Sequence, residues 1–252
     1  MFHSLNKLQG SPIVATDGEI GTLRGFLFDN EKWDIRFLVM NTGNWIPGRQ
    51  VLISVEHMLP PESDSGKVFV KLTREQIKNS RNLSEVVASS TDAATNVAEY
   101  YRMSNRGEFS GLGQEPGVVG QFEGRRLRGT DEVIGCHLRA TDGDIGHVED
   151  FIFDDESLII RYLTINTRNW LPGKKVLISP EWIETINWYD RKVFVDLNRE
   201  AIKTAPEHDP NRLPDRDYEE QVFEHYQRPR YWIPLHELRQ PGVEEIAPRH
   251  PN

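Results

Sequence analysis

Cysteine and long hydrophobic runs are scarce in this sequence of 252 residues. Cys136 is the single cysteine, which excludes an internal disulfide framework and suits a reducing cytoplasm. No stretch approaches the roughly 18 to 20 consecutive apolar residues that a membrane-spanning helix needs, and residues 1–7 lack the apolar core of a secretory signal. We therefore expect a cytoplasmic protein with no transmembrane segment, and peripheral contact with a membrane surface through a partner stays open.

Positive charge is also in short supply. The chain has 30 lysines and arginines against 39 aspartates and glutamates, a formal net charge of −9. Such a balance argues against a protein whose main task is to bind nucleic-acid phosphates. The short basic run Arg125-Arg126-Leu127-Arg128 could touch RNA, but three arginines in a loop of an acidic chain are more often solvated or paired. We expect no direct nucleic-acid binding.

No nucleophile, base and orienting group stand at a recognisable catalytic spacing. Cys136 has His137 beside it, but the matching position of the first repeat is Ser11, and a small buried thiol on a strand is the favoured interpretation. The eight histidines are scattered, without the pairs that set up a metal site. The sequence therefore predicts no enzyme, no catalytic residues and no cofactor.

Carboxylates gather around one turn of the second half of the chain. Oxygen ligands of this kind can hold a divalent cation, but the Asp-x-Asp-x-Asp-Gly loop is absent and a solvated acidic turn is favoured. We predict no metal site, and cation binding by this hairpin stays open. The residues concerned are Glu149, Asp150, Asp154, Asp155 and Glu156.

What the chain does contain is a long internal repeat. Residues 41–54 return as residues 166–179, an offset of 125, and 23 of the 40 positions in 15–54 are identical to those in 140–179 without a gap. Chance does not supply such identity, so the chain is a duplication. Because the repeated residues are mostly turn and core residues, they indicate architecture more than activity.

Each repeat reads as about five short strands followed by a short helix. Asp17-Gly18 favours a tight hairpin, Gly21 and Gly25 indicate a bulge or bend, and Ile35 to Met40 reads as a central strand. Thr73 with Gln76 forms a capping-box pattern at the start of the helix. Many short strands with frequent turn signals predict a small barrel.

The order of these motifs resembles the PRC-barrel domain, which the cytoplasmic domain of the photosynthetic reaction-centre H subunit shares with the C-terminal domain of the ribosome-maturation factor RimM. The motifs are the Asp-Gly hairpin, Ile-Gly, Phe-x-Phe-Asp, Arg-x-Leu, Trp-x-Pro-Gly, Val-Leu-Ile-Ser and Val-Phe-Val-x-Leu. They occur twice, over roughly 8–80 and 133–205. The resemblance implies a mainly β protein of two small PRC-type barrels, each closed by a short helix, in a family of assembly and interaction modules that brings no catalytic residues.

The repeat and the composition of its flanks divide the chain into four segments. We expect a first PRC-barrel at 1–81, a partly helical connector at 82–130, a second PRC-barrel at 131–205, and a C-terminal arm at 206–252 that is helical and then disordered. Aromatic residues at helical spacing in the arm predict that it packs on its own barrels or, with less weight, on a partner.

The weak candidates for interaction residues are all aromatic. Trp45 and Trp170 stand in the repeated loop, where each indole plugs the end of its own barrel or, alternatively, forms a lid over a ligand. Tyr226, Tyr231 and Trp232 stand in the arm. They complete the set of candidates.

Two functions from different classes compete. We favour a non-enzymatic interaction or scaffold protein that acts in assembly or regulation of a larger complex, through a protein partner that the sequence does not identify. A homo-oligomer is left open. The alternative is a small-ligand or metal-responsive binding protein that uses the crevice between the barrels, beneath Trp45 and Trp170.

Overall fold

The computed structural model describes residues 1–43, 50–61, 65–78, 127–167 and 173–233. Statements on the structure refer to those ranges. The predictions for Trp45 and Trp170, for the connector as far as residue 126, and for the end of the arm from residue 234 fall outside the described residues.

The first unit is built from short strands and single helical turns, as the repeat predicts. Its elements are β1 (Phe2–Ser4), α1 (Leu5–Leu8), β2 (Pro12–Ala15), β3 (Gly18–Asp29), β4 (Ile35–Asn41), β5 (Gln50–Ser54), the 3-10 helix η1 (Val55–His57), β6 (Val68–Phe69) and α2 (Arg74–Lys78). The predicted capping box is present, because the Thr73 amide donates to Gln76 Oε1 at 2.8 Å and the Gln76 amide donates to Thr73 Oγ1 at 3.3 Å.

The second unit repeats this order and adds a strand between η2 and β13 and a helix at its end. Its elements are β7 (Leu127–Gly129), α6 (Thr130–Val133), β8 (His137–Ala140), β9 (Gly143–Asp154), β10 (Ile159–Asn166), β11 (Lys175–Ile178), the 3-10 helix η2 (Pro180–Trp182), β12 (Ile183–Asn187), β13 (Lys192–Val195), α7 (Arg199–Thr204) and α8 (Arg216–His225). Helix α8 lies in the arm, within the segment for which the sequence predicts a helix.

The protein is mainly β, with two sheets. The first has the order β5-β4-β3-β2-β6 with β7 added to β3, and the second has the order β11-β10-β9-β8-β13-β12 with β1 added to β9. The predicted closed barrels are not seen as hydrogen-bonded rings within the described ranges. In the second sheet the two edge strands β11 and β12 follow each other along the chain through η2, so a covalent turn joins the edges where a ladder of hydrogen bonds would close a barrel.

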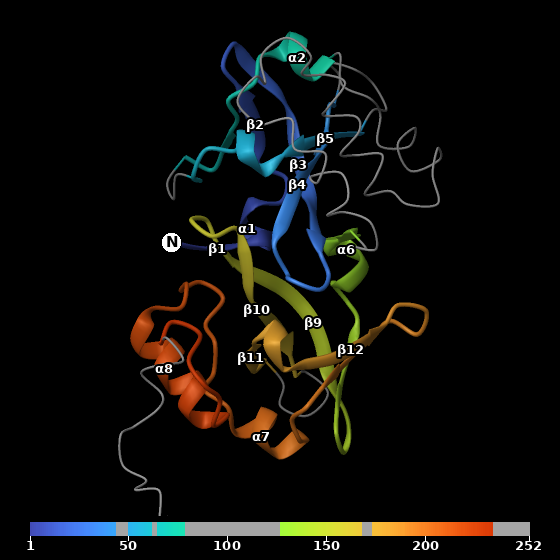
Figure 1. Cartoon of the computed structure of the whole chain (residues 1–252), viewed down its shortest axis with the longest axis vertical. Helices are drawn as coiled ribbons and strands as arrows, with labels where there is room; N and C mark the ends of the chain where they lie inside the picture. The colour runs from blue at the N-terminus through green and yellow to red at the C-terminus, as the bar shows by residue number, and fades with distance from the viewer. Residues whose placement is uncertain (44–49, 62–64, 79–126, 168–172, 234–252) are drawn as a thin grey trace, which may run out of the picture.

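The two units exchange their first strands. β1 of the first unit pairs antiparallel with β9, and β7 of the second unit pairs antiparallel with β3. The registers are equivalent under the 125-residue offset, since Phe2 lies opposite Asp154 just as Leu127 lies opposite Asp29. Figure 1 shows β1 crossing from the upper unit to run beside β9 of the lower unit. The two units are therefore in direct contact through their strands.

A reciprocal bridge marks the centre of this junction. Asp34 and Ile159, which are equivalent positions of the repeat, pair with each other. The flanking backbone hydrogen bonds are also equivalent: Ile35 N donates to Leu158 O at 2.7 Å, and Ile160 N donates to Trp33 O at 2.8 Å. The arrangement is that of an internal pseudo-dimer with a self-complementary face.

Phenylalanine rings fill the space between the units. Phe26 meets Phe153 with ring centroids 5.4 Å apart, and the equivalent pair Phe28 and Phe151 lies at 6.1 Å. These four side chains are at most 1% exposed, and they belong to one continuous core that includes both units. Burial of a large apolar side chain stabilises a fold by about 1.5 to 3 kcal/mol, so this shared core holds the units together.

Two equivalent glycines let the long strands bend. Gly21 and Gly146 both have φ of 153°, and a Cβ there would lie 2.1 Å from Asn41 O or 2.4 Å from Asn166 O. The pairings β2–β3 and β8–β9 each shift register beside these glycines. The predicted interruption at Gly21 is thus a bulge at which the partner backbone comes too close for a side chain.

Candidate functional site at the junction of the units

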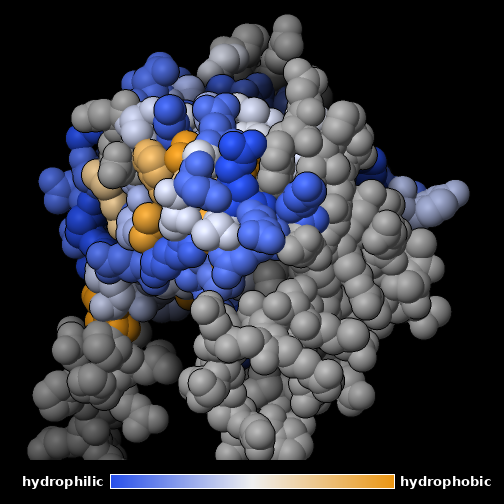
Figure 2. Space-filling model, turned by 90° about the horizontal axis from the view of Figure 1, so that it is seen from above, coloured by the Kyte–Doolittle hydropathy of each residue, from blue (hydrophilic) through white to orange (hydrophobic). Residues whose placement is uncertain are grey.

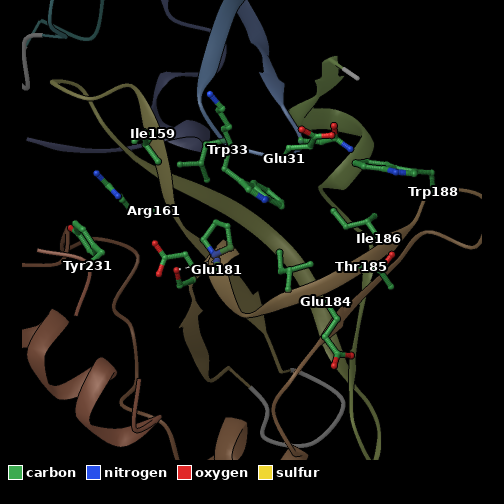
Figure 3. A pocket seen from close by; sticks show the side chains of 16 residues that line it. Glu31, Trp33, Ile159, Arg161, Glu181, Glu184, Thr185, Ile186, Trp188 and Tyr231 are labelled. Carbon is green, nitrogen blue, oxygen red and sulfur yellow. Dashed lines mark hydrogen bonds between the residues drawn. The ribbon is translucent and has the colours of Figure 1, made fainter. Parts of the chain in front are cut away.

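A cavity of about 540 Å³ lies where the two units meet. The turn from Asn30 to Trp33 forms its first-unit wall, and the start of β10, η2, β12 and Trp188 form its second-unit wall. Figure 3 shows Trp33 entering from the first unit, Arg161, Tyr231 and Glu181 grouped on one side, and Trp188 on the opposite side. Ligand sites favour cavities of about 300 to 1,000 Å³ and places between domains, so this is the candidate site.

The backbone of Trp33 is shaped by the junction. Trp33 has φ of 59° and the equivalent Leu158 has φ of 56°, a left-handed conformation that bulky residues seldom adopt. Asp29 Oδ1 accepts hydrogen bonds from the amides of Glu31 and Lys32 at 3.0 and 3.2 Å and forms the turn before it. Because the unusual φ recurs in both units, it belongs to the reciprocal bridge and directs the Trp33 ring onto Phe28, 5.0 Å away.

Arg161 is the cation on the second-unit wall. Its guanidinium lies 4.2 Å from the centroid of the Tyr231 ring, and its one hydrogen bond in the described part of the chain goes from Nη2 to Ser157 Oγ at 3.4 Å. The Nε atom is buried without a hydrogen-bond partner there. Since a guanidinium offers five donors, Arg161 keeps donor capacity at the cavity.

The equivalent arginine of the first unit is in a different state. Arg36 Nη2 forms an ion pair with Asp34 Oδ2 at 2.6 Å. The second unit has Ile159 where the first has Asp34, so the carboxylate that pairs with Arg36 has no counterpart beside Arg161. Glu181 lines the cavity, but the first unit has Glu56 at that position. Glu184, which also lines the cavity, stands where the first unit has Leu59, so the difference specific to the two arginines is the missing Asp34 carboxylate.

Tyr231 reaches the cavity because a buried carboxylate holds it. Glu219 on α8 is 1% exposed, and its Oε1 accepts hydrogen bonds from the hydroxyls of Tyr162 at 2.6 Å and Tyr231 at 2.8 Å. Its Oε2 pairs with Arg216 at 2.9 Å. Burial, with the hydrogen bond to Glu219 and its charge, raises the pKa of Tyr231 to about 12. The hydroxyl therefore stays protonated and donating at neutral pH.

A hairpin beside the cavity carries an exposed aromatic residue. Trp188 lines the cavity and Arg128 stacks over its ring at 4.2 Å, while the next residue, Tyr189, is 96% exposed. Figure 1 shows the β12 hairpin projecting from the side of the lower unit. The first unit has Ser63 and Asp64 at the equivalent positions, so the aromatic pair belongs to one half of the repeat.

The surface at the far end of the first unit has a different character. Figure 2 looks down on that end, where the coloured residues are mostly hydrophilic with small separate hydrophobic areas. Among the described residues, the exposed large hydrophobic side chains are Met1, Leu59 and Tyr189. Scattered single apolar residues are ordinary on a surface, whereas Tyr189 directly follows Trp188, which lines the cavity.

Comparison with known protein families identifies the domain type of the two repeated units. The family model of the PRC-barrel domain matches residues 1–77 and 127–202, over half of the chain. The chain belongs to the PRC-barrel domain family. The match in two segments is consistent with a tandem duplication. Its second segment begins at β7, before the predicted start at residue 131. No curated protein matches the chain.

The predicted arm residues of this PRC-barrel protein lie in different places. Tyr226 is 6% exposed and packs on Trp182 at 4.8 Å, so it belongs to the core. Tyr231 lines the cavity. Trp232 is half-buried, with its ring 5.1 Å from Phe223 and Arg216 stacked over it at 4.2 Å. The described part of the arm folds back on the second unit, which is the preferred of the two predicted arrangements.

Sequence reasoning missed Arg161, Trp188, Tyr189 and Glu219. The repeat contains a signal for three of them, because positions that depart from the first PRC-barrel unit stand out when the halves are aligned: Ile159 beside Arg161 replaces Asp34, and Trp188-Tyr189 replaces Ser63-Asp64. Glu219 has no such signal. Its partner Tyr162 lies 57 residues away, and on a charged helix it reads as one acidic residue among several.

The acidic hairpin makes contacts within the protein. Asp150 is 8% exposed; it accepts hydrogen bonds from Ser4 Oγ at 2.6 Å and from the Asn6 amide at 2.9 Å. Burial raises the pKa of Asp150, and these hydrogen bonds oppose the shift. His3 Nε2 lies 3.0 Å from Asp155. Within the described ranges, no group of three or more His, Cys, Asp or Glu side chains could hold a metal ion.

Cys136 is fully buried immediately before β8, and its Sγ donates to Glu132 O at 3.1 Å. Burial raises the pKa of the Cys136 thiol, although the charge of Arg191 opposes the shift. A thiol with a raised pKa is a poor nucleophile at neutral pH. The prediction that this thiol is buried is confirmed, but Cys136 lies just before β8 and not on a strand. Separately, none of the described helices is both long enough and apolar enough to cross a membrane.

Proposed function

We propose that this chain is a non-enzymatic interaction or scaffold protein that binds a protein partner through the surface around the junction cavity. Membership of the PRC-barrel domain family suggests a scaffold or interaction module. The observation that carries the proposal is that the second unit lines the junction cavity with Arg161, Tyr231 and Trp188 and exposes Tyr189, the residue after Trp188. Trp, Tyr and Arg are the residue types that dominate binding energy at protein interfaces.

We further propose that each unit is the small barrel typical of the family, closed by its short helix. The connection of the edge strands β11 and β12 through η2 supports this, as does the parallel pairing of β2 with β6 and of β8 with β13. The partner is a protein and not a nucleic acid, in line with the net charge of −9. The protein partner can be a second copy of this chain. The proposed location of the protein is the cytoplasm.

The test replaces the aromatic pair by its first-unit equivalents. The double substitution Trp188→Ser with Tyr189→Asp is compared with wild type and with the control Leu59→Ala, which changes an exposed apolar residue of the first unit. Quantitative co-purification from the native cell should show a partner that wild type and the control retain and the double variant loses, at unchanged melting temperature. Equal recovery by all three proteins would exclude this surface as the contact.

Binding of a small ligand is the second candidate, and the cavity volume of about 540 Å³ favours it. It would use the same junction cavity between the units, with Trp33 and Trp188 as apolar walls and Arg161 as the polar anchor. The predicted crevice site beneath Trp45 and Trp170 falls outside the described residues. The peptide and small-anion measurements of the next subsection separate the two candidates.

A further inference from the structure

We infer that the junction cavity receives an acidic side chain of a partner polypeptide, with its carboxylate on Arg161. The inference rests on the proposed interaction function and specifies the chemistry of the partner. Its starting point is the difference between equivalent arginines: Asp34 neutralises Arg36, whereas Arg161 forms no ion pair with any described residue and faces a cavity. A guanidinium binds a carboxylate through two parallel hydrogen bonds.

The surroundings of Arg161 favour this ligand geometry. The ring of Tyr231 lies against its guanidinium at 4.2 Å, and the hydrogen bond from Tyr231 to Glu219 at 2.8 Å fixes that ring in turn. A guanidinium held against an aromatic face loses less conformational freedom when it binds. Lys32 lines the first-unit wall of the same cavity and adds a second positive charge.

The carboxylates of the cavity specify what flanks the acidic group. Glu31, Glu181 and Glu184 also line it, and they would repel a ligand that carries negative charge alone. A polypeptide can place a basic residue next to its acidic one and so match both signs of charge. Charge complementarity of this kind selects partners more than it adds raw affinity. The matching chemistry is therefore an acidic residue with basic neighbours.

The test uses acetyl-Lys-Glu-Lys-amide as the probe, with acetyl-Lys-Gln-Lys-amide as its match without the carboxylate. NMR titration of the full chain follows the Nε–H signal of Arg161 and the backbone amides around the cavity. The glutamate peptide should shift these signals, and the glutamine peptide should bind at least about tenfold more weakly because it lacks the ionised acceptor. Equal shifts by the two peptides would overturn the inference.

Variants assign the effect to Arg161. Arg161→Gln should weaken glutamate-peptide binding by about tenfold or more, and Arg161→Lys should recover part of it, since lysine keeps the charge but not the bidentate geometry. Arg24→Gln makes the same charge change at an exposed position of the first unit and should leave binding as in wild type. Binding that survives Arg161→Gln, or that Arg24→Gln reduces equally, would overturn the inference.

Two further titrations identify the source of the carboxylate. Glutarate and inorganic phosphate carry negative charge without a polypeptide or basic neighbours, and both should shift the Arg161 signal far less than the peptide does. Equal shifts would assign the cavity to free anions and overturn the polypeptide assignment. If the double variant at Trp188 and Tyr189 loses its partner while the peptide leaves Arg161 unshifted, this inference fails and the proposed function stands. If the double variant keeps its partner and the peptide also leaves the Arg161 signal unshifted, both this inference and the proposed function fail.

Discussion

In the first unit, Arg36 forms an ion pair with Asp34. In the second unit, the equivalent Arg161 lies beside a cavity. Around this difference the halves are alike: each lends its first strand to the other, each places phenylalanines in the shared core, and each has a left-handed residue before the central bridge. Residues common to both halves hold the pseudo-dimer together. Residues that differ, among them Ile159, Trp188 and Tyr189, surround the site.

The largest expected effect tests the likeness of the two halves. Gly21→Ala and Gly146→Ala should each destabilise the protein by about 3 to 5 kcal/mol, because a side chain at positive φ is strained and its Cβ would collide with a carbonyl oxygen of the neighbouring strand. Urea unfolding measures both variants. A loss in one unit and none in the other would break the equivalence of the two bulges.

The next largest effect concerns Glu219, the buried carboxylate of the arm, which has no counterpart in the first unit. Glu219→Ala should cost about 3 kcal/mol, because it leaves the buried hydroxyl of Tyr162 without its acceptor and Arg216 without its charge partner. Glu219→Gln keeps an acceptor oxygen and should cost about half as much. Thermal and urea unfolding supply the values. An alanine variant as stable as wild type would show that the arm is held without this carboxylate.

These two features also show how far sequence reasoning reaches. The repeat predicts two units, the hairpin at Asp17-Gly18 and the interruption at Gly21, since each depends on local residue chemistry. It does not predict the strand exchange, because β1 is Phe-His-Ser and β7 is Leu-Arg-Gly, which share no residue and owe their pairing to backbone hydrogen bonds. The candidate site was missed for a related reason: its residues come together only when the arm and both units assemble.

A pH effect of intermediate size tests burial beside the arm. His208 is 6% exposed, and burial lowers its pKa to about 4, with the charges of Lys175 and Lys7 adding to the shift and Asp209 opposing it. The fold therefore favours neutral His208. Its contribution is complete above the unfolded pKa of about 6.5 and is lost as the pH falls towards 4, by an amount on the order of 2 kcal/mol.

Unfolding free energies of wild type and His208→Gln between pH 7 and pH 4 measure this contribution. The wild type should lose stability relative to the variant over that range, whatever the offset between them at pH 7. Parallel pH profiles would show that His208 is not held neutral by the fold.

The smallest effect returns to the two arginines. Arg36→Gln should cost about 0.5 to 1 kcal/mol, since it breaks the ion pair with Asp34. Arg161→Gln breaks no ion pair among the described residues and loses the contact with the Tyr231 ring, so it should cost no more than that. Paired thermal melts measure the difference. A larger loss of stability for Arg161→Gln than for Arg36→Gln would identify Arg161 as the more important structural residue of the two, contrary to this account.

The central claim is that partner contact belongs to the second-unit side of the junction. Its most direct test places a photo-crosslinking amino acid at Tyr189 or, in a separate protein, at the repeat-equivalent Asp64, and irradiates both in the native cell. The account predicts a discrete protein adduct from position 189, lost when Trp188 is changed to Ser, and no such adduct from position 64. Matching adducts from both positions, or none from position 189, would contradict it.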